Sequence, residues 1–334
     1  MNTDLKVLVG KAATNASTAD TTYQQLNGEQ SAQFMSKVVE QSVMTKYANI
    51  MPIKGNSFDF NHIDLSSKIA VGLGENDIMA GTADETLATF SGRRLTPESV
   101  RMFAKISTAK FAYTNIEGPA AIQKIQDMMA VEFGNGIEEI CVKSELGGTT
   151  PAGYGTDMLS IIDGWRSLAD SGNIYDHSGA NFNTTLFREL WNSVPSKWRG
   201  MPSDWKFFLP INAKALLWDL FAQRSTNLGD GLLMGSDGGF KFLGVDLEFV
   251  PYIPTDVAGT LTQSASESLY TWVMLCRPKD MYIGYNPAVK TFIHPDAEGT
   301  FLNVSLWAEM APQFAQIETV ATAVNVTLNV TLPS

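Results

Sequence analysis

Histidines come first among the residues that could do chemistry, because imidazole is a common metal ligand and general base. The sequence contains His62, His177 and His294, which lie far apart in the chain. None has the H-E-x-x-H spacing that places two imidazoles on one face of a helix. We therefore predict no metal site and no cofactor, and we expect all three imidazoles to be structural or exposed.

Nucleophilic and acid–base chemistry has no clear starting point either. No G-x-S-x-G motif occurs, and Cys141 and Cys276 each lie in an apolar stretch that favours a buried thiol. Glu138 and Glu139 are neighbours in a predicted helix, so their side chains point in different directions and do not form an acid–base pair. We predict that the protein is not an enzyme. A hydrolase with an unrecognised carboxylate pair is the alternative.

Two glycine-containing stretches resemble phosphate-binding loops only superficially. VGLGEN at 71–76 lacks the third glycine of a dinucleotide motif, and GSDGG at 235–239 lacks the Lys-Ser/Thr of a phosphate loop. Both are predicted to be ordinary loops.

The composition is that of a globular, acidic chain. Of 334 residues, 44% are hydrophobic and 18% charged, with a net charge of -11. This balance disfavours a protein that neutralises phosphates with clustered Lys and Arg, so nearby DNA would be confined rather than bound. No apolar run reaches the roughly 20 residues of a membrane helix, and the N-terminus lacks the apolar core of a signal peptide. We expect synthesis in a cytoplasm.

The first part of the chain contains three different kinds of segment. Residues 1–28 are polar, with little to bury, so we expect a neighbouring subunit to hold them. Apolar residues at helical spacing predict an amphipathic helix over 29–49, which Pro52 ends. Residues 54–95 are poor in large apolar side chains, and as a hairpin each arm of about 20 residues would reach roughly 60 Å.

Charged residues are distributed unevenly along residues 54–95 and the predicted strand that follows them. The predicted strand 100–113 has a basic side, and the predicted helix 118–146 follows it. A domain boundary is expected at 147–156. The acids in the middle of the connection are Glu75, Asp77, Asp84 and Glu85; the bases at its end are Arg93 and Arg94, and those of the strand are Arg101, Lys105 and Lys110.

The second half alternates predicted helices with predicted strands. Helices are expected over 157–169, 184–195 and 209–224. Alternation of apolar residues predicts a two-faced strand over 320–332, packed on something such as the long helix. The remaining predicted strands are 240–250, with Gly244 as a kink or bulge at its start, and 269–276, 281–285, 289–294 and 301–307.

The order of these elements resembles the HK97-like major capsid proteins of tailed bacteriophages. The likeness rests on element order over nearly the whole chain, and on two stretches, LPINAKALLWDLFAQR and DGLLMGSDGGFKFLGVDLEFVPYIP. It implies an α+β fold: an N-terminal arm and helix (1–52), an extended loop (53–95), a peripheral domain with a long spine helix (96–156 and 308–334), and an axial domain with a central β-sheet flanked by helices (157–307).

The resemblance also implies a structural function. Such a chain self-assembles into pentamers and hexamers of an icosahedral head that encloses double-stranded DNA, in a virion assembled in the bacterial cytoplasm. Scaffolding and portal proteins are implied partners, and decoration proteins are a further candidate; the short arm favours a separate scaffolding protein. From the charge pattern, we expect the acids of the extended loop to face a neighbour's basic strand. An encapsulin nanocompartment shell is the alternative within the fold.

Overall fold

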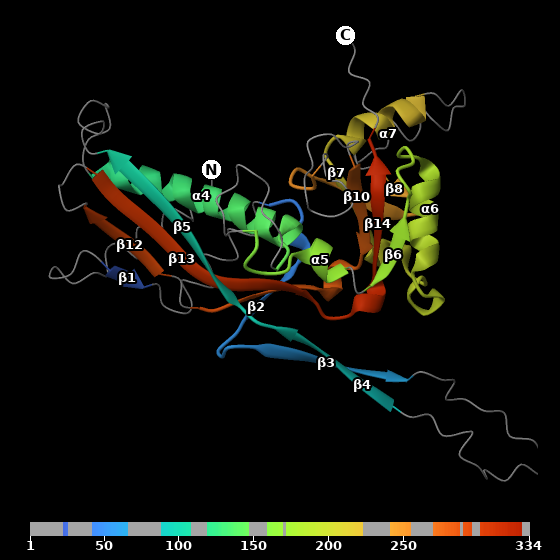
Figure 1. Cartoon of the computed structure of the whole chain (residues 1–334), viewed down its shortest axis with the longest axis horizontal. Coiled ribbons are helices and arrows are strands. Elements are labelled where there is room, and N and C mark those ends of the chain that lie inside the picture. Colours follow the sequence, from blue (N-terminus) through green and yellow to red (C-terminus); the bar gives the residue numbers. More distant parts are fainter. Residues whose placement is uncertain are drawn as a thin grey trace, which may run out of the picture.

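The chain is described by a computed structural model, which covers residues 23–25, 42–65, 88–107, 119–146, 159–169, 172–222, 241–254, 270–287, 290–295 and 301–328. These residues form an α+β fold with two six-stranded sheets and a two-stranded ribbon that projects away from both (Figure 1). Within the described ranges, no helix is long and apolar enough to cross a membrane.

The helices are α4 (Pro119–Lys143), α5 (Trp165–Ala169), α6 (Thr184–Ser193) and α7 (Ala213–Ala222), with 3-10 turns η1 (Thr45–Tyr47), η2 (Ser196–Trp198), η3 (Pro202–Asp204), η4 (Pro278–Asp280) and η5 (Ile317–Thr319). The first sheet contains β1 (Tyr23–Gln25), β2 (Asn49–Pro52), β5 (Glu98–Ser107), β11 (Met281–Tyr285), β12 (Lys290–Pro295) and β13 (Phe301–Phe314). The second sheet contains β6 (Asn173–Asp176), β7 (Lys206–Pro210), β8 (Lys241–Phe242), β9 (Val245–Val250), β10 (Tyr270–Cys276) and β14 (Val320–Thr327), and the ribbon consists of β3 (Phe58–Leu65) and β4 (Ala88–Leu95).

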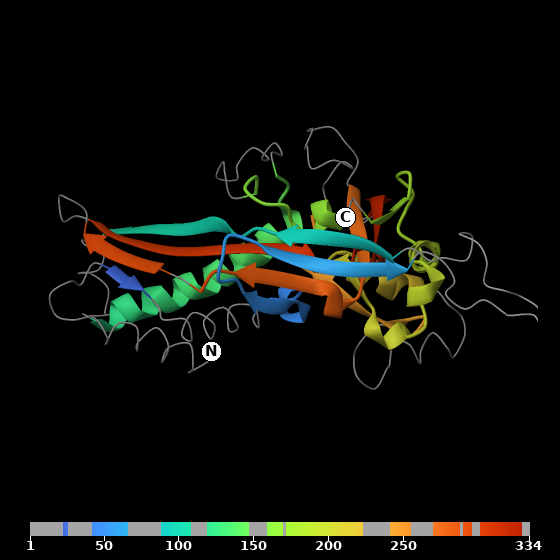
Figure 2. The same ribbon diagram turned by 90° about the horizontal axis from the view of Figure 1, so that it is seen from below.

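The first sheet is built around β13, which is 14 residues long. It pairs antiparallel with β5 and β12 along its first part and with β11 at its end. Helix α4 lies along one face of this sheet (Figure 2). Phe133, Ile137 and Ile140 are spaced by four and three residues on α4, and all three join Leu306 and Met310 of β13 in one buried core.

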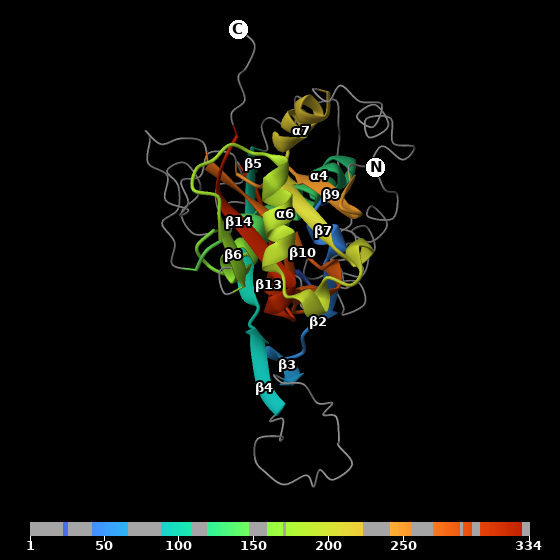
Figure 3. The same ribbon diagram turned by 90° about the vertical axis from the view of Figure 1, so that its right-hand side faces the viewer.

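The second sheet is covered on both faces. In β7, Phe207 and Leu209 enter the core formed with α6 and α7, whereas Phe208 enters the core that contains α4 and α5. β10 repeats this alternation, with Val273 on the first side and Met274 on the second. Figure 3 shows α6 in front of the sheet, with β6 at one edge. Strands buried on both faces have continuous apolar sequences, because neither face contacts water.

Among the described elements, the chain crosses between the two sheets three times: through α4 and α5 between β5 and β6, through η4 after β10, and through η5 after β13. The sheets therefore divide the chain differently from the predicted domains. β11, β12 and the first half of β13 fall within the predicted axial domain (157–307), but they lie in the first sheet, with β5. β14 falls within the predicted peripheral range 308–334, but it lies in the second sheet. Alternation identifies a strand but not its partner, and β14 pairs with β10 and β6.

Several local predictions need correction. The predicted helix 29–49 does not extend to its expected end, because η1 and β2 occupy the described part from 42 onward; 29–41 lie outside the described residues. Only α5 is helical within the described part of 157–169. The predicted strand 240–250 is a hairpin whose turn residues, Leu243 and Gly244, have φ of 51° and 81°. Two positive φ values are typical of the two-residue turn that matches strand twist. The helices predicted over 118–146 and 184–195 are present as α4 and α6.

Candidate assembly surfaces

The ribbon of β3 and β4 is the first candidate surface, because it extends beyond both sheets (Figures 1 and 3). Its strands pair antiparallel from Phe58 opposite Leu95 to Leu65 opposite Ala88. Across it, Arg94 Nε donates to Asp59 Oδ1 at 2.8 Å, and this hydrogen bond holds the pKa of the Asp59 carboxyl below its usual range. Both side chains are exposed, so the pair contributes little to the ribbon's orientation.

The base of the ribbon is fixed by apolar packing on the first sheet. Ile53 and Leu95 are buried against β11, where Gly284 leaves them space. A Cβ at Gly284 would lie 2.5 Å from Ile53 Cδ1 and from Leu95 Cδ2. The ring of Phe60 packs on Tyr282, with centroids 4.8 Å apart. The ribbon therefore leaves the body in one defined direction.

The bases predicted at the end of the extended loop have partners within their own chain. Arg93 Nε donates to Gln313 Oε1 at 3.2 Å, and Gln313 Nε2 donates to the Arg94 carbonyl at 2.8 Å. Burial lowers the pKa of the Arg93 guanidinium. Contact of Arg93 and Arg94 with a neighbour stays a prediction. The predicted acidic partners lie outside the described residues: Glu75, Asp77, Asp84 and Glu85.

The second candidate surface is the face of the first sheet opposite α4. β5 alternates, with Val100 facing the core while Arg101, Phe103 and Lys105 are exposed. Phe103 retains 52% of its accessible surface, and the Arg101 guanidinium lies 5.5 Å from its ring centroid. Of the predicted basic strand, Arg101 and Lys105 thus lie on one surface; Lys110 falls outside the described residues.

The same face continues onto β13 and β12. Trp307 lies opposite Arg101 on one side and opposite Lys290 on the other, so one row across three strands has an indole between two cations. Trp307 is 39% exposed. We call this surface the basic-aromatic strip; it consists of Arg101, Phe103, Lys105, Lys290 and Trp307. The aromatic members could not be found from sequence, because their exposure depends on which strands pair.

Glu138 has a role that the sequence did not indicate. It is 2% exposed in the α4 core, and its Oε1 accepts the backbone N–H groups of Val43 at 2.8 Å and Met44 at 2.6 Å. Burial raises the pKa of its carboxyl, while the two hydrogen bonds act in the opposite direction. Glu139 instead binds Lys143 at 2.8 Å. The two carboxylates do not converge, as predicted.

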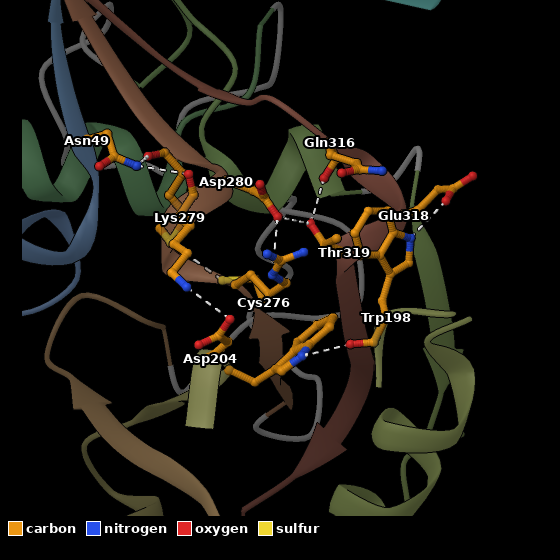
Figure 4. A network of polar contacts seen from close by, with 12 residues as sticks. Asn49, Trp198, Asp204, Cys276, Lys279, Asp280, Gln316, Glu318 and Thr319 are labelled. Carbon is orange, nitrogen blue, oxygen red and sulfur yellow. Dashed lines mark hydrogen bonds and ion pairs between the residues drawn. The ribbon is translucent and has the colours of Figure 1, made fainter. Parts of the chain in front are cut away.

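A polar network joins η4 and η5, two of the segments that cross between the sheets (Figure 4). Thr319 of η5 donates to Asp280 Oδ2 of η4 at 2.7 Å, and the Ala315 N–H donates to the Asp280 carbonyl at 2.9 Å. Lys279 Nζ reaches Asp204 at 2.9 Å. η4 and η5 are therefore hydrogen-bonded to each other, and η4 also forms an ion pair with η3, which precedes β7 of the second sheet.

Candidate catalytic and metal-binding residues are not assembled into a site in the part that the structure describes. His177 is buried, and its Nε2 lies 3.1 Å from the Asn181 carbonyl; the side chains of His62 and His294 lie outside the described part of the structure. Cys141 and Cys276 are free and buried, and burial raises the pKa of both thiols. No group of three His, Cys, Asp or Glu in the described ranges could hold a metal.

Comparison with known proteins shows that this chain is similar to proteins of capsid shells. A putative prophage capsid protein of Bacillus subtilis (strain 168), YqbE, is 24% identical over 212 residues, which span 64% of this chain and 64% of that protein. The structure of a satellite phage P4 procapsid including size determination (Sid) protein matches with a TM-score of 0.62 and 10% identity, over 98% of each chain. No protein-family model matches the sequence.

An encapsulin shell has a similar fold. The holo-SrpI encapsulin complex of Synechococcus elongatus PCC 7942 matches with a TM-score of 0.54 and 10% identity, over 86% of this chain and 88% of that chain. Likeness at this level of identity concerns the fold, whereas the prophage relative is similar in sequence as well. The resemblance to HK97-like major capsid proteins of phages, indicated by the order of elements, is therefore confirmed.

Proposed function

We propose that this chain is the major capsid protein of a tailed phage, and that it self-assembles into the pentamers and hexamers of an icosahedral head enclosing double-stranded DNA. The ribbon of β3 and β4 carries the proposal, because it projects beyond the body of its own subunit (Figure 1). Heterologous contacts of this kind close into rings, and many modest contacts together stabilise a shell.

In this proposal the parts of the molecule have the roles that the family resemblance implies. The first sheet and α4 form the peripheral domain, with α4 as its spine, and the second sheet with α6 and α7 forms the axial domain. Residues 53–95 are the extended loop that lies across a neighbouring subunit. Residues 1–52 are the arm and its continuation; within them, β1 pairs with β12 of its own chain.

The basic-aromatic strip is the proposed receptor for a neighbour's extended loop. The loop carries Glu75, Asp77, Asp84 and Glu85, and the strip presents Arg101, Lys105 and Lys290, so the charges are complementary. We expect Lys105→Glu with Lys110→Glu to block assembly while the subunit stays folded. Normal shells from that double variant would contradict the charge pairing.

Electron microscopy of negatively stained protein, combined with light scattering, tests the proposal as a whole. The purified chain is compared with and without a candidate scaffolding protein. Shells, tubes, or rings of five or six subunits are the expected products. A compact monomer or dimer under every condition would contradict the proposed function and would favour the alternative, a soluble enzyme.

An encapsulin-like shell is the second candidate function, because the fold of the SrpI complex is similar. The two candidates differ in content: a phage head takes up DNA, whereas an encapsulin takes up protein cargo. Nuclease-resistant DNA in particles from the native source supports the head, and co-purified enzyme supports the compartment. Scaffolding and portal proteins are proposed partners of the head; the related P4 procapsid includes a size determination protein.

A further inference from the structure

Residues 42–53 contact both sheets and α4, although they contain only a 3-10 turn and a short strand. At their start, the N–H groups of Val43 and Met44 bind the buried Glu138 of α4. At their end, β2 pairs parallel with β11, and the Ile53 N–H donates to the Tyr285 carbonyl at 2.8 Å. We call these residues the strap.

The middle of the strap reaches the second sheet through Tyr47. Its hydroxyl donates to Glu248 of β9, and its ring lies 6.0 Å from that of Phe208. Lys206 Nζ lies 3.1 Å from Glu248 Oε1 and 4.4 Å from the Tyr47 ring centroid. Burial, followed by the hydrogen bond to Glu248, raises the pKa of the Tyr47 hydroxyl, so it remains a donor at neutral pH.

The strap also binds η4, the segment through which the chain crosses from β10 of the second sheet to β11 of the first. Asn49 Nδ2 donates to the carbonyls of Lys279 at 2.9 Å and Met281 at 3.3 Å (Figure 4). The two sheets share an apolar core, but apolar packing has no preferred direction. Hydrogen bonds have a preferred direction, and the strap makes them to α4, to β11 of the first sheet and to β9 of the second sheet.

We propose that the strap fixes the angle between the two sheets, and that this angle sets the curvature of the assembled shell. Glu138, Tyr47 and Glu248 are its positioning residues. The first half of the proposal concerns one subunit only, whereas the second half depends on the proposed capsid function.

Distances between spin labels test the first half in the unassembled chain. Ser99→Cys on the first sheet and Thr185→Cys on α6 are exposed sites for the labels, and the native Cys141 and Cys276 are buried. We expect Glu138→Ala to broaden the distance distribution about twofold, because it removes the acceptor of two N–H groups. Glu138→Gln retains an acceptor and should restore the narrow distribution.

Two further variants keep the test decisive if Glu138→Ala does not fold. Tyr47→Phe removes only the hydroxyl, and Glu248→Ala removes its acceptor; each should broaden the distribution. Glu139→Gln is the matched control, because Glu139 lies on the same helix but binds Lys143. An unchanged distribution in folded Tyr47→Phe and Glu248→Ala would overturn the proposal.

Particle sizes test the second half. Variants that broaden the distance distribution should also give shells of mixed diameter, measured by electron microscopy. Broad distances with shells of wild-type diameter would overturn the link to curvature and leave the strap as a feature of the subunit. If the wild-type chain forms no shells, the proposed function fails, and the label distances still decide the first half.

Discussion

The two sheets of this protein differ in how many faces their own chain covers. The second sheet has helices on both faces, and its central strands β7 and β10 bury almost every described side chain. The first sheet has α4 on one face, and the other face carries the ribbon base and the basic-aromatic strip. The second sheet is thus complete within one subunit. The first retains surface that a neighbouring subunit can cover.

The difference is visible in single strands. WVMLC in β10 is apolar throughout, since alternate residues enter two separate cores. In β5, Val100 lies in the core and Met102 packs against it, whereas Arg101, Phe103 and Lys105 are exposed. The same β geometry therefore gives a two-sided core in one case and an exposed face, the proposed assembly surface, in the other. Substitutions in the two sheets should separate stability from assembly.

The largest effect on stability is expected from Phe207→Ala in the second sheet. Phe207 is fully buried, and removal of such a ring leaves a cavity that costs about 3–5 kcal/mol. Urea denaturation measures the loss. Phe103→Ala is the matched change in the first sheet, where the exposed ring should alter unfolding by less than about 0.5 kcal/mol while assembly is impaired. Equal losses of unfolding free energy in Phe207→Ala and Phe103→Ala would contradict the proposed difference between the two sheets.

Gly284→Ala should have the next largest effect, at the base of the ribbon. The added methyl group would displace Ile53 and Leu95, and overpacking of this kind costs about 1–3 kcal/mol. Hydrogen exchange should show faster exchange at the Ile53 amide, which bonds to Tyr285. Gly200→Ala is the control, because a Cβ there meets nothing within 4 Å. Unchanged exchange at Ile53 would contradict the packing argument.

Glu138 should give the stability of the fold a pH dependence. Because its folded-state pKa is raised, the folded state binds more protons than the unfolded state between the two pKa values, so stability falls as pH rises through that window. Each unit by which the pKa is raised contributes about 1.4 kcal/mol to the fall. Thermal unfolding from about pH 4 upward should show this slope in the wild type and a smaller one in Glu138→Gln. A steeper slope in the variant would refute the assignment.

The smallest effect is expected from Asp59→Asn in the ribbon. The lowered pKa of Asp59 means that its pairing with Arg94 is present above the usual carboxyl pKa and is lost as pH falls through the folded-state value. Both partners are exposed, so unfolding measured at neutral pH should be unchanged within error. A clear loss would show that the ion pair, rather than the apolar base, orients the ribbon.

Sequence by itself determined the elements whose signals are local. Helical spacing located α4 and α6, and apolar alternation or continuous apolar runs located β5, β10 and β14. Composition and motif spacing directed the interpretation away from catalysis, and the order of elements indicated the capsid family. These inferences need only near neighbours in the chain, because helix and strand periodicities are local properties.

Tertiary structure alone decided which elements meet. Nothing local assigns β14 to the second sheet, and nothing near Glu138 shows that it binds Val43 and Met44, which lie more than ninety positions away. The exposure of Trp307 likewise depends on β5 and β12 flanking β13. Pairing and burial arise from contacts between distant parts of the chain, and a single strand's pattern is compatible with several partners.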